Sequence, residues 1–359
     1  MKILAIETSC DDTCAAVLDD DKILSNVISS QTDLHSKWGG VVPDIAKRAH
    51  QERIMPVIET ALNRARVKIE SIEVIAVTIG PGLAIALGVG VNKAKELALK
   101  YKKKLIAVNH IEGHMLVNLA KNKNGNPKRE IQFPSLALTV SGGHTKIVLV
   151  KRNKSPLHPP LTRGVKSVFD YEVVGETLDD AAGEALDKAA KLLGLGYPGG
   201  PVIERLSESN SVNNKSLLNL PKSLQDKNVL DYSFSGLKTS FYYQIKDWPK
   251  EKVSKNLANL AATIQEAVFE QLLRKYKLAI EKYKPKSLLC GGGVMANLTL
   301  RKRIRKLAKE VNLPIWLPFK KELNTDNAAM IGVAAYYKAK RREFVKEIEK
   351  LDRDPRAAL

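Results

Sequence analysis

The sequence predicts an α/β protein with two lobes, and three observations support that prediction. The chain of 359 residues is long enough for two domains of ordinary size. Hydrophobic residues make up 44% of the chain and aromatic residues 6%, which is typical of a globular α/β protein with an aliphatic core. A strand, a short polar turn and a returning strand open the chain, and the same pattern recurs from Ser135. This internal repeat predicts that each lobe begins with a hairpin.

The first lobe is predicted to alternate strands and helices. The elements expected, in order, are strands at 2–8, 14–18 and 23–30, a helix at 43–65, a strand at 74–79, a helix at 83–100 and a strand at 105–108. Pro43 suits the first turn of a helix. The turn Ser9–Thr13 could face a phosphate or a metal ion, although an ordinary acidic hairpin turn fits the same residues.

One apolar stretch requires comparison with a membrane span. Residues 74–91 run for 18 positions without a charge, which is close to the length of a transmembrane helix. Gly80-Pro81-Gly82 interrupts the stretch, so a strand, a turn and a helix are favoured. Glu7 and Asp11 break the first apolar run, which argues against a secretory signal. The three cysteines cannot form a disulfide framework and are expected to be reduced in a cytoplasmic protein: Cys10, Cys14 and Cys290.

The charge balance favours a polyanionic partner. The chain has 58 Lys and Arg against 39 Asp and Glu, a net charge of +19. Such an excess is typical of nucleic-acid binding, although a basic solvated surface would give the same count. Two clusters are candidates for phosphate contacts. They are Arg152, Lys154, Arg163 and Lys166 in a Pro-containing loop at 152–166, and Arg301, Lys302, Arg303, Arg305, Lys306 and Lys309 in a helix.

The segment His110-Ile111-Glu112-Gly113-His114 is the first candidate site. On a helix, residues spaced i, i+4 lie on one face, so both imidazoles could hold one metal ion and leave other coordination positions open. Two partly exposed histidines would show the same spacing. The preceding strand ends just before His110, where α/β sheets keep their sites. A zinc peptidase needs Glu directly after the first His, whereas Glu112 comes one residue late and is turned by ~100°.

The second lobe repeats the strand and turn pattern. Strands are predicted at 135–140, 146–151 and 286–290. Residues 179–188 are expected to begin a helix with acidic residues in its first turn. Residues 194–201 are rich in Gly and Pro, which indicates a turn or a close approach of backbone to a ligand. Gly291-Gly292-Gly293 lies between a strand and a basic helix, a position that suits a nucleotide or a plain tight turn.

The end of the chain offers a third metal ligand. Thr325 is expected to cap a final helix, and Asp326 is either a helix-start carboxylate or an oxygen ligand that completes a His, His, Asp site. Residues beyond Lys338 extend past this helix start and could contact nucleic-acid phosphates. The expected division is a discontinuous first lobe of 1–125 and 325–345, a second lobe of 133–324, and a charged tail of 346–359.

The two hairpins suggest the duplicated architecture of the actin, Hsp70 and sugar kinase superfamily (ASKHA), with nucleotide and metal held between the lobes. A longer set of motifs resembles the tRNA N6-adenosine threonylcarbamoyltransferase family, formerly called O-sialoglycoprotein endopeptidases. The motifs occur in family order over residues 3 to about 338. They are Ile6–Thr13, His110 with His114, Val140–Thr145, Asp179–Lys188, Tyr197–Pro201, Ser233–Thr239, Gly291–Asn297 and Thr325–Ala329.

The resemblance implies an acyltransferase. It would move the threonylcarbamoyl group from threonylcarbamoyl-AMP to N6 of adenosine 37 in tRNAs that read ANN codons, and release AMP. His110, His114 and Asp326 match the family's metal ligands, for Fe²⁺ or Zn²⁺ with Mg²⁺ as an alternative. Asp12, where the family often has Glu, could orient the metal shell or accept a proton. The positions that match the adenylate site are Thr139, Val140, Ser141, Gly142, Gly143, Asp187, Gly200 and Asn297.

The resemblance also implies partners and leaves rival functions open. The implied partners are tRNA, a synthase that makes the adenylate, an inactive paralogue and a small ATPase, with self-association left open and no membrane. An ATPase or small-molecule kinase of the same superfamily would use ATP or ADP with the same hairpins but would not need the His, His, Asp set. A metallopeptidase and a non-catalytic scaffold are the other rivals. The loop at 152–166 is longer and more basic than the resemblance leads us to expect.

Overall fold

The computed structural model describes residues 1–152, 169–208 and 217–359. They divide into two compact units. Unit 1 contains residues 1–131, 151–171 and 316–359, and unit 2 contains residues 132–150 and 172–315. Residues 316–324, assigned to the second lobe from the sequence, and residues 346–359, expected as a separate tail, both fall in unit 1. Lys154, Arg163 and Lys166 lie outside the described residues.

Unit 1 is built on a five-stranded sheet with the strand order β3-β2-β1-β4-β5. Its strands are β1 (Lys2–Glu7), β2 (Asp12–Asp19), β3 (Lys22–Ser30), β4 (Val74–Gly80) and β5 (Lys104–Asn109). Its helices are α1 (Thr32–Ser36), α2 (Pro43–Ala65), α3 (Ala84–Lys100), α4 (His110–Leu116) and α11 (Ala328–Lys340). Short 3-10 helices lie at Ile69–Ser71, Val117–Leu119, Lys321–Leu323 and Ile348–Lys350.

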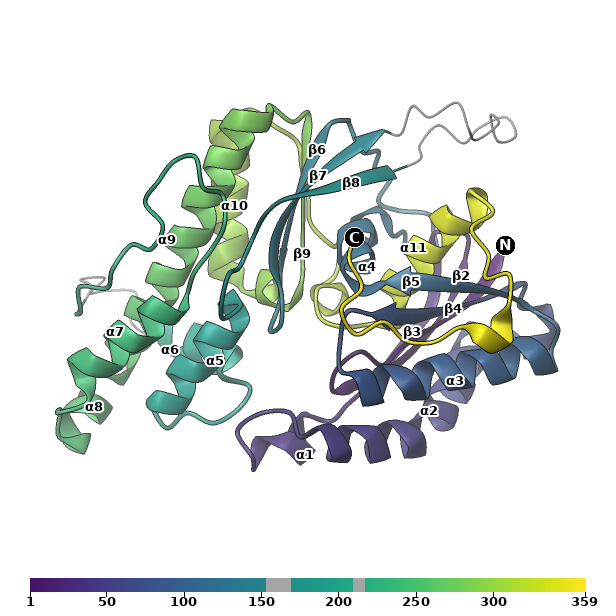
Figure 1. Ribbon diagram of the computed structural model, residues 1–359, viewed down its shortest axis with the longest axis horizontal. Coiled ribbons are helices and arrows are strands. Elements are labelled where there is room, and N and C mark those ends of the chain that lie inside the picture. The colour runs from purple at the N-terminus through teal and green to yellow at the C-terminus, as the bar shows by residue number, and fades with distance from the viewer. Residues whose placement is uncertain (153–168, 209–216) are drawn as a thin grey trace. The chain divides into compact units, whose positions relative to one another are not determined.

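The two faces of this sheet pack against different helices, as Figure 1 shows. Alternate residues of a strand point to opposite faces. Leu4 and Ile6 of β1 belong to the apolar core that includes residues of α2 and α3. Leu18 of β2 faces α11, where an added Cβ at Gly332 would lie 2.2 Å from Leu18 Cδ1. A glycine at this position therefore lets the final helix lie close to the sheet.

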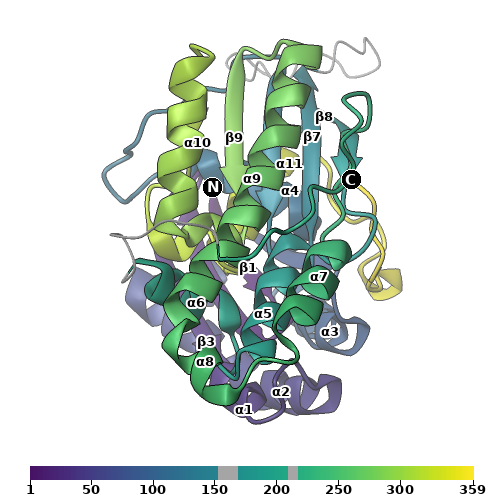
Figure 2. The ribbon, with the colours of Figure 1, turned by 90° about the vertical axis from the view of Figure 1, so that its left-hand side faces the viewer.

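Unit 2 is built on a second five-stranded sheet with the order β10-β9-β6-β7-β8. Its strands are β6 (Ser135–Val140), β7 (Thr145–Arg152), β8 (Phe169–Glu176), β9 (Ser287–Gly291) and β10 (Ile315–Trp316). Strands β7, β8 and β10 extend into the ranges of unit 1. Its helices are α5 (Ala182–Leu192), α6 (Gly199–Glu208), α7 (Ser235–Ile245), α8 (Lys250–Lys255), α9 (Leu257–Tyr283) and α10 (Leu298–Glu310), with a 3-10 helix, η3, at Gly293–Ala296. Figure 2 shows α9 and α10 alongside β9, and the Tyr276 hydroxyl of α9 donates to Leu136 O at 2.8 Å.

The two sheets have the same topology, which confirms the internal repeat. In the first, β1 pairs antiparallel with β2 and parallel with β4. In the second, β6 pairs antiparallel with β7 and parallel with β9. The predicted fold class, two α/β lobes each led by a hairpin, is confirmed. The apolar stretch at 74–91 is β4, a turn and part of α3, and none of the described helices is long and apolar enough to cross a membrane.

Two predicted helix starts are wrong. Helix α5 begins at Ala182, so Asp179 lies before its first turn. The Asp179 carboxylate instead accepts from Phe234 N at 2.7 Å and Ser235 N at 3.2 Å, where α7 begins. Thr325 does not cap α11, because Asn327 Oδ1 accepts from Met330 N at 3.1 Å. Asp179 is thus taken up by the start of α7, and the cap of α11 is Asn327, two residues after Thr325.

Candidate active site

Three side chains predicted as metal ligands come together in unit 1. The ligand atoms of His110, His114 and Asp326 lie within 4.8 Å of one another. Both histidines project from α4, with ring centroids 4.6 Å apart and ring planes at 83°. Asp326 Oδ1 lies 3.6 Å from His110 Nε2 and 3.2 Å from His114 Nε2. Residues more than two hundred positions apart therefore converge on one point, and the group could hold a metal ion.

The spacing and the polar environment of these atoms fit a metal ion. Two donors bound tetrahedrally at about 2.0–2.1 Å from an ion lie about 3.3 Å apart, close to the contacts with Asp326. His114 is fully buried, and neither of its ring nitrogens has a hydrogen-bond partner among the described residues. Leaving a buried polar group unpaired costs about 1–3 kcal/mol. A cation that accepts the lone pair of His114 would remove that cost.

The helix that carries both histidines is held at its start and along its side. Asn109 ends β5 and caps α4, because its Oδ1 accepts from Ile111 N at 2.8 Å and from Glu112 N at 3.3 Å. Gly113, between the two ligands, faces α11, where an added Cβ would lie 3.0 Å from Ile331 Cδ1. The close packing of α4 on α11 brings the histidines to Asp326, which precedes α11.

A second layer of buried groups, missed in the sequence analysis, orients His110. Glu7 is fully buried, and its Oε2 lies 3.2 Å from His110 Nδ1. Thr78 Oγ1 donates to the same carboxylate at 2.5 Å, and Ser9 Oγ lies 3.1 Å from His110 Nδ1. Burial opposes a charged imidazole, yet Asp326 and Glu7 together raise the pKa of His110 to about 9. The signal in the sequence was a lone carboxylate at the end of an otherwise apolar strand.

Glu112 faces away from the two histidines. It is buried, and its carboxylate accepts from the Tyr171 hydroxyl at 3.0 Å. The same carboxylate lies 3.7 Å from Lys338 Nζ and 3.6 Å from Arg341 Nη2. It therefore fixes α4 to the end of α11 and is not placed to activate a water at a metal. This geometry speaks against the metallopeptidase alternative.

Asp12 lies at the start of β2 in a group of carboxylates. Its Oδ1 is buried and accepts no hydrogen bond from the described residues. Burial, with the nearby charges of Asp11, Asp326 and Glu7, raises the pKa of Asp12 to about 7. An acid with this pKa exchanges a proton near neutral pH, as a general base must. Asp12 is therefore chemically suited to accept a proton.

The predicted adenylate positions of unit 2 surround the turn between β6 and β7. Ser141 N donates to His144 O at 2.8 Å and closes the turn, while Gly142 and Gly143 are exposed with no atom within 4 Å of an added Cβ. Gly292 has φ +96°, and an added Cβ there would lie 2.3 Å from Val140 O. Thr139 Oγ1 is buried without a hydrogen-bond partner among the described residues. These turns offer backbone groups and open space.

The other adenylate positions are helix caps. Asp187 Oδ1 accepts from Gly199 N at 2.8 Å and Gly200 N at 3.0 Å, at the start of α6. Asn297 Oδ1 accepts from Leu300 N at 3.0 Å at the start of α10, and its Nδ2 donates to Gln265 Oε1 at 2.9 Å. These side chains are engaged in ordering the helix starts around the turn. Contact with a nucleotide remains a prediction for them.

The basic helix is α10, with only part of its stripe exposed. Arg305 is exposed, whereas Arg303 pairs with Glu266 at 2.7 Å. Arg301 is half-buried, and its Nη1 donates to Met295 O at 3.4 Å. The residues of this stripe that are exposed are Lys302, Arg305, Lys306 and Lys309. Contact of any of them with tRNA stays a prediction.

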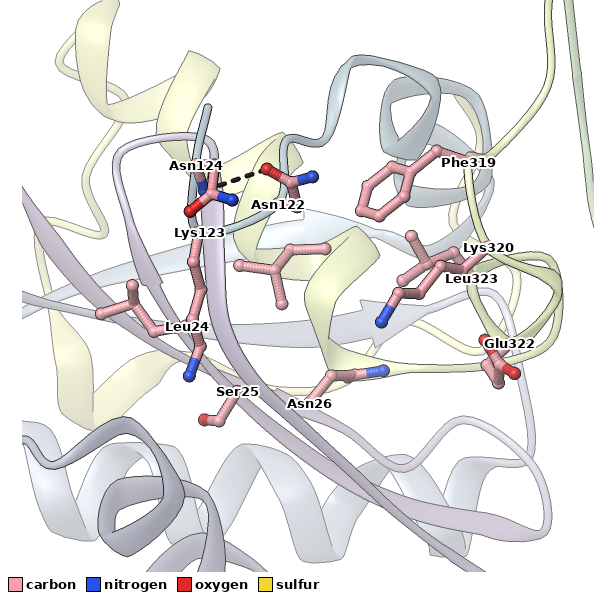
Figure 3. Close-up of a pocket in the computed structure, with 11 residues that line it drawn as sticks. Leu24, Ser25, Asn26, Asn122, Lys123, Asn124, Phe319, Lys320, Glu322 and Leu323 are labelled. Atoms are coloured by element: carbon pink, nitrogen blue, oxygen red, sulfur yellow. Dashed lines mark hydrogen bonds between the residues drawn. The ribbon is translucent and has the colours of Figure 1, made fainter. Parts of the chain in front are cut away.

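A cavity of about 620 Å³ lies elsewhere in unit 1, as Figure 3 shows. It is lined by residues 23–26 of β3, by 122–124 and by Phe319, Lys320, Glu322 and Leu323, and by none of the predicted metal ligands. Asn26, on its wall, accepts from Ala329 N at 3.2 Å. The wall of the cavity thus supports the start of α11, close to Asp326.

Comparison with known proteins gives the family. The model of a family described as tRNA N6-adenosine threonylcarbamoyltransferase matches residues 22–157 and 162–333. A protein of that name from Thermosipho africanus is 44% identical over 336 residues, which are 94% of this chain and 94% of the relative. Another from Kosmotoga olearia is 43% identical over 344 residues, 96% of this chain and 95% of the relative.

A solved structure supports the fold alone. The structure of T. kodakarensis HypF superposes on 95% of this chain with a TM-score of 0.58 and 13% identity. This chain matches 48% of HypF, about half of that protein. The match agrees with the predicted fold class of two α/β lobes. On the family model and the curated relatives, which extend over nearly the whole chain, this protein belongs to the tRNA N6-adenosine threonylcarbamoyltransferase family.

Proposed function

We propose that this protein transfers the threonylcarbamoyl group from threonylcarbamoyl-AMP to N6 of adenosine 37 in tRNAs that read ANN codons. One observation carries the proposal: the family match extends across both units, from the metal group to the glycine turns. In the reaction, N6 forms a bond to the carbonyl carbon of the donor. The bond from that carbon to the phosphate oxygen breaks, AMP leaves, and N6 loses one proton.

His110, His114 and Asp326 are proposed to bind the metal ion. Two imidazoles and a carboxylate favour Zn²⁺ or Fe²⁺ over Mg²⁺, which prefers oxygen ligands. When bound, such a cation supplies a Lewis acid that can polarise a carbonyl or neutralise a leaving phosphate. Glu7 holds the ring of His110 in a fixed orientation through Nδ1.

The turns of unit 2 are proposed to hold the adenylate. Glycines at 142 and 143 allow backbone to approach an anionic group, and the starts of α6 and α10 favour negative charge. Thr139 offers a hydroxyl that has no partner among the described residues. Because the mixed anhydride is already activated, orientation of donor and amine should supply much of the rate enhancement.

Asp12 is proposed as the group that accepts the N6 proton. Its buried Oδ1, which has no hydrogen-bond partner among the described residues, and its pKa of about 7 suit this role. The net charge of +19 suits a tRNA partner, which would place the reaction in the cytoplasm. A synthase must supply the adenylate, and an inactive paralogue and a small ATPase are the further partners that we expect.

Single-turnover transfer of labelled threonylcarbamoyl to an unmodified ANN-decoding tRNA tests the proposal. The metal-loaded protein, with its helper proteins present, should modify this tRNA and leave a tRNA that reads other codons unlabelled. His110→Ala should lose the transfer. Metal-dependent ATP hydrolysis without any tRNA labelling would contradict the proposal and favour the kinase-like alternative.

A further inference from the structure

The last residues of the chain, from Arg341 onwards, do not extend away from unit 1. Val345, Ile348 and Leu351 pack against the apolar core between the sheet, α2 and α3. Val345 N donates to Leu105 O of β5 at 2.9 Å. Figure 1 shows this segment in yellow, leaving α11 and passing along the sheet and α3. The segment is therefore part of the fold of unit 1.

Its middle part is anchored on α3. Lys95 Nζ donates to Glu349 O at 2.7 Å and to Leu351 O at 2.9 Å. Arg353 lies over Gly88, where an added Cβ would be 2.8 Å from Arg353 Nη1. The side chains of α3 thus direct the segment towards the carboxyl ends of β4 and β5.

The final residues lie on two turns that follow these strands. Asp354 N donates to Ile79 O at 2.7 Å, and Gly82 N donates to Pro355 O at 3.2 Å. An added Cβ at Gly80 would lie only 1.7 Å from Asp354 O, so the two backbones are in direct contact. The segment therefore covers the turn at residues 80–82 by backbone hydrogen bonds on both sides.

The same residues reach the start of the metal-ligand helix. Asn109 Nδ2 donates to Ala357 O at 3.3 Å and to Ala358 O at 2.9 Å. Its Oδ1 caps α4 through Ile111 N at 2.8 Å. One amide side chain thus joins the end of the chain to the helix, and its neighbour in sequence is His110.

A second connection runs through the covered turn. Leu83 N donates to Ser9 O at 2.8 Å, and Ser9 Oγ lies 3.1 Å from His110 Nδ1. The end of the chain therefore supports His110 from two sides, through Asn109 and through the 80–83 turn. Both connections act on the position of the imidazole and neither touches the ligand atoms.

We propose that residues 354–359 are a positioning strap that holds the start of α4 and so presets His110 and His114 for a metal ion. The inference rests on the proposed metal site. Helix α4 has only 7 residues, and so short a helix depends on tertiary contacts for its order. With the strap in place the two imidazoles keep their mutual geometry before metal binds. Without it the start of α4 would open locally, and metal would bind more weakly.

Two variants test the strap in the full protein. The first is a chain that ends at Arg353, which keeps the packing of Leu351 and removes the contacts of 354–359. The second is Asn109→Asp, which keeps an oxygen that caps α4 but replaces the donor to Ala357 and Ala358 with an acceptor. Asn109→Ser is the matched uncharged variant, because a serine also caps a helix and also lacks the amide donor. Thermal unfolding of the metal-free forms identifies any variant that fails to fold.

The measurements are the dissociation constant for Zn²⁺, by competition with a chelator, and hydrogen exchange of the α4 amides. We expect metal binding about 10-fold weaker than wild type in the shortened chain and in both Asn109 variants, with faster exchange over 111–116. If the folded variants bind Zn²⁺ as tightly as the wild type and exchange their α4 amides at the same rate, the strap proposal is wrong. The proposal of the metal site would then still stand. If the wild type does not bind Zn²⁺ stoichiometrically, and its Zn²⁺ binding does not differ from that of His110→Ala, both proposals are overturned.

Discussion

The two groups of candidate site residues are built in different ways. The metal group of unit 1 consists of side chains: His110 and His114 are buried, Asp326 is half-buried, and residues far away in sequence contact them. The turns of unit 2 consist of backbone, with Gly142 and Gly143 exposed and open space beside them. A side-chain site depends on the identity of each residue, whereas a backbone site depends on the absence of a Cβ. Different substitutions should therefore reduce the stability or the ligand binding of the two regions.

A loss of stability is expected at Glu112, on the helix that carries His110 and His114. Glu112→Ala removes one carboxylate from Lys338 and Arg341, but Glu343 still pairs with both cations. The loss should therefore lie below the about 3–5 kcal/mol in unfolding free energy that a fully broken buried ion pair costs. Denaturant unfolding measures this cost. Glu112→Gln keeps an acceptor for Tyr171 and should cost less. If Glu112→Gln abolished activity with the fold and metal content unchanged, a direct catalytic role for this carboxylate would be indicated instead.

In unit 2 the expected effects follow the space around each glycine. Gly292→Ala combines φ +96° with a Cβ placed 2.3 Å from Val140 O, so we expect a loss of about 3 kcal/mol or more. Gly143→Ala meets no atom within 4 Å and should change the unfolding free energy by less than about 0.5 kcal/mol. Its methyl group should nevertheless weaken binding of the adenylate. Equal adenylate affinity in Gly143→Ala and wild type would count against this turn as the nucleotide site.

Glu7 tests the second layer of the metal group. Glu7→Gln keeps the shape of the side chain but removes the charge beside His110 Nδ1, and such changes weaken metal binding about 10–100-fold. Chelator competition measures the effect. Thr78→Val is the graded control, because it removes only the hydrogen bond to Glu7 and should have a smaller effect. Unchanged metal affinity in Glu7→Gln would show that His110 is oriented by other contacts.

Asp12 should give the metal group a pH dependence. Burial and the nearby carboxylates raise its pKa from 3.8 to about 7 in the folded state, so the folded protein holds this proton more tightly than the unfolded chain. The stability that the proton provides is complete below pH ~4 and is lost as the pH rises through about 7. In metal-free protein, the unfolding free energy of wild type relative to Asp12→Asn should fall by about 3–4 kcal/mol between pH 4 and 8.

Metal provides the control for this last prediction. A bound cation near Asp326 would favour the charged form of Asp12, so the difference between wild type and Asp12→Asn should shrink in the metal-loaded protein. A difference that is flat with pH in the metal-free protein would mean that the Asp12 carboxyl keeps an ordinary pKa. In that case its role as a proton acceptor near neutral pH would lose its support.

Local patterns were enough to find the parts of the site that lie within single elements. The spacing of His110 and His114 predicted that both lie on one face of a helix. The strand predicted before them placed them at the end of β5. The hairpin pattern gave both lobe starts, because a strand, turn and strand depend on neighbouring residues. The predicted starts of α5 and α11 lay two or three residues too early, because several neighbouring polar residues suit a helix start and the sequence pattern does not choose between them. The sequence analysis named no element between 202 and 285, where the structure has α7, α8 and the 27-residue α9.

The sequence by itself determined the duplicated α/β fold, the family and the candidate ligands, because these follow from periodicity and from ordered motifs. Only the tertiary structure decided that Glu7 contacts His110, that Glu112 faces Lys338 and Arg341, and that residues 354–359 lie on the start of α4. Each of these is a contact between segments far apart in the chain. Such contacts depend on how helices and strands pack in three dimensions, and the spacing of residues along one element carries no information about them.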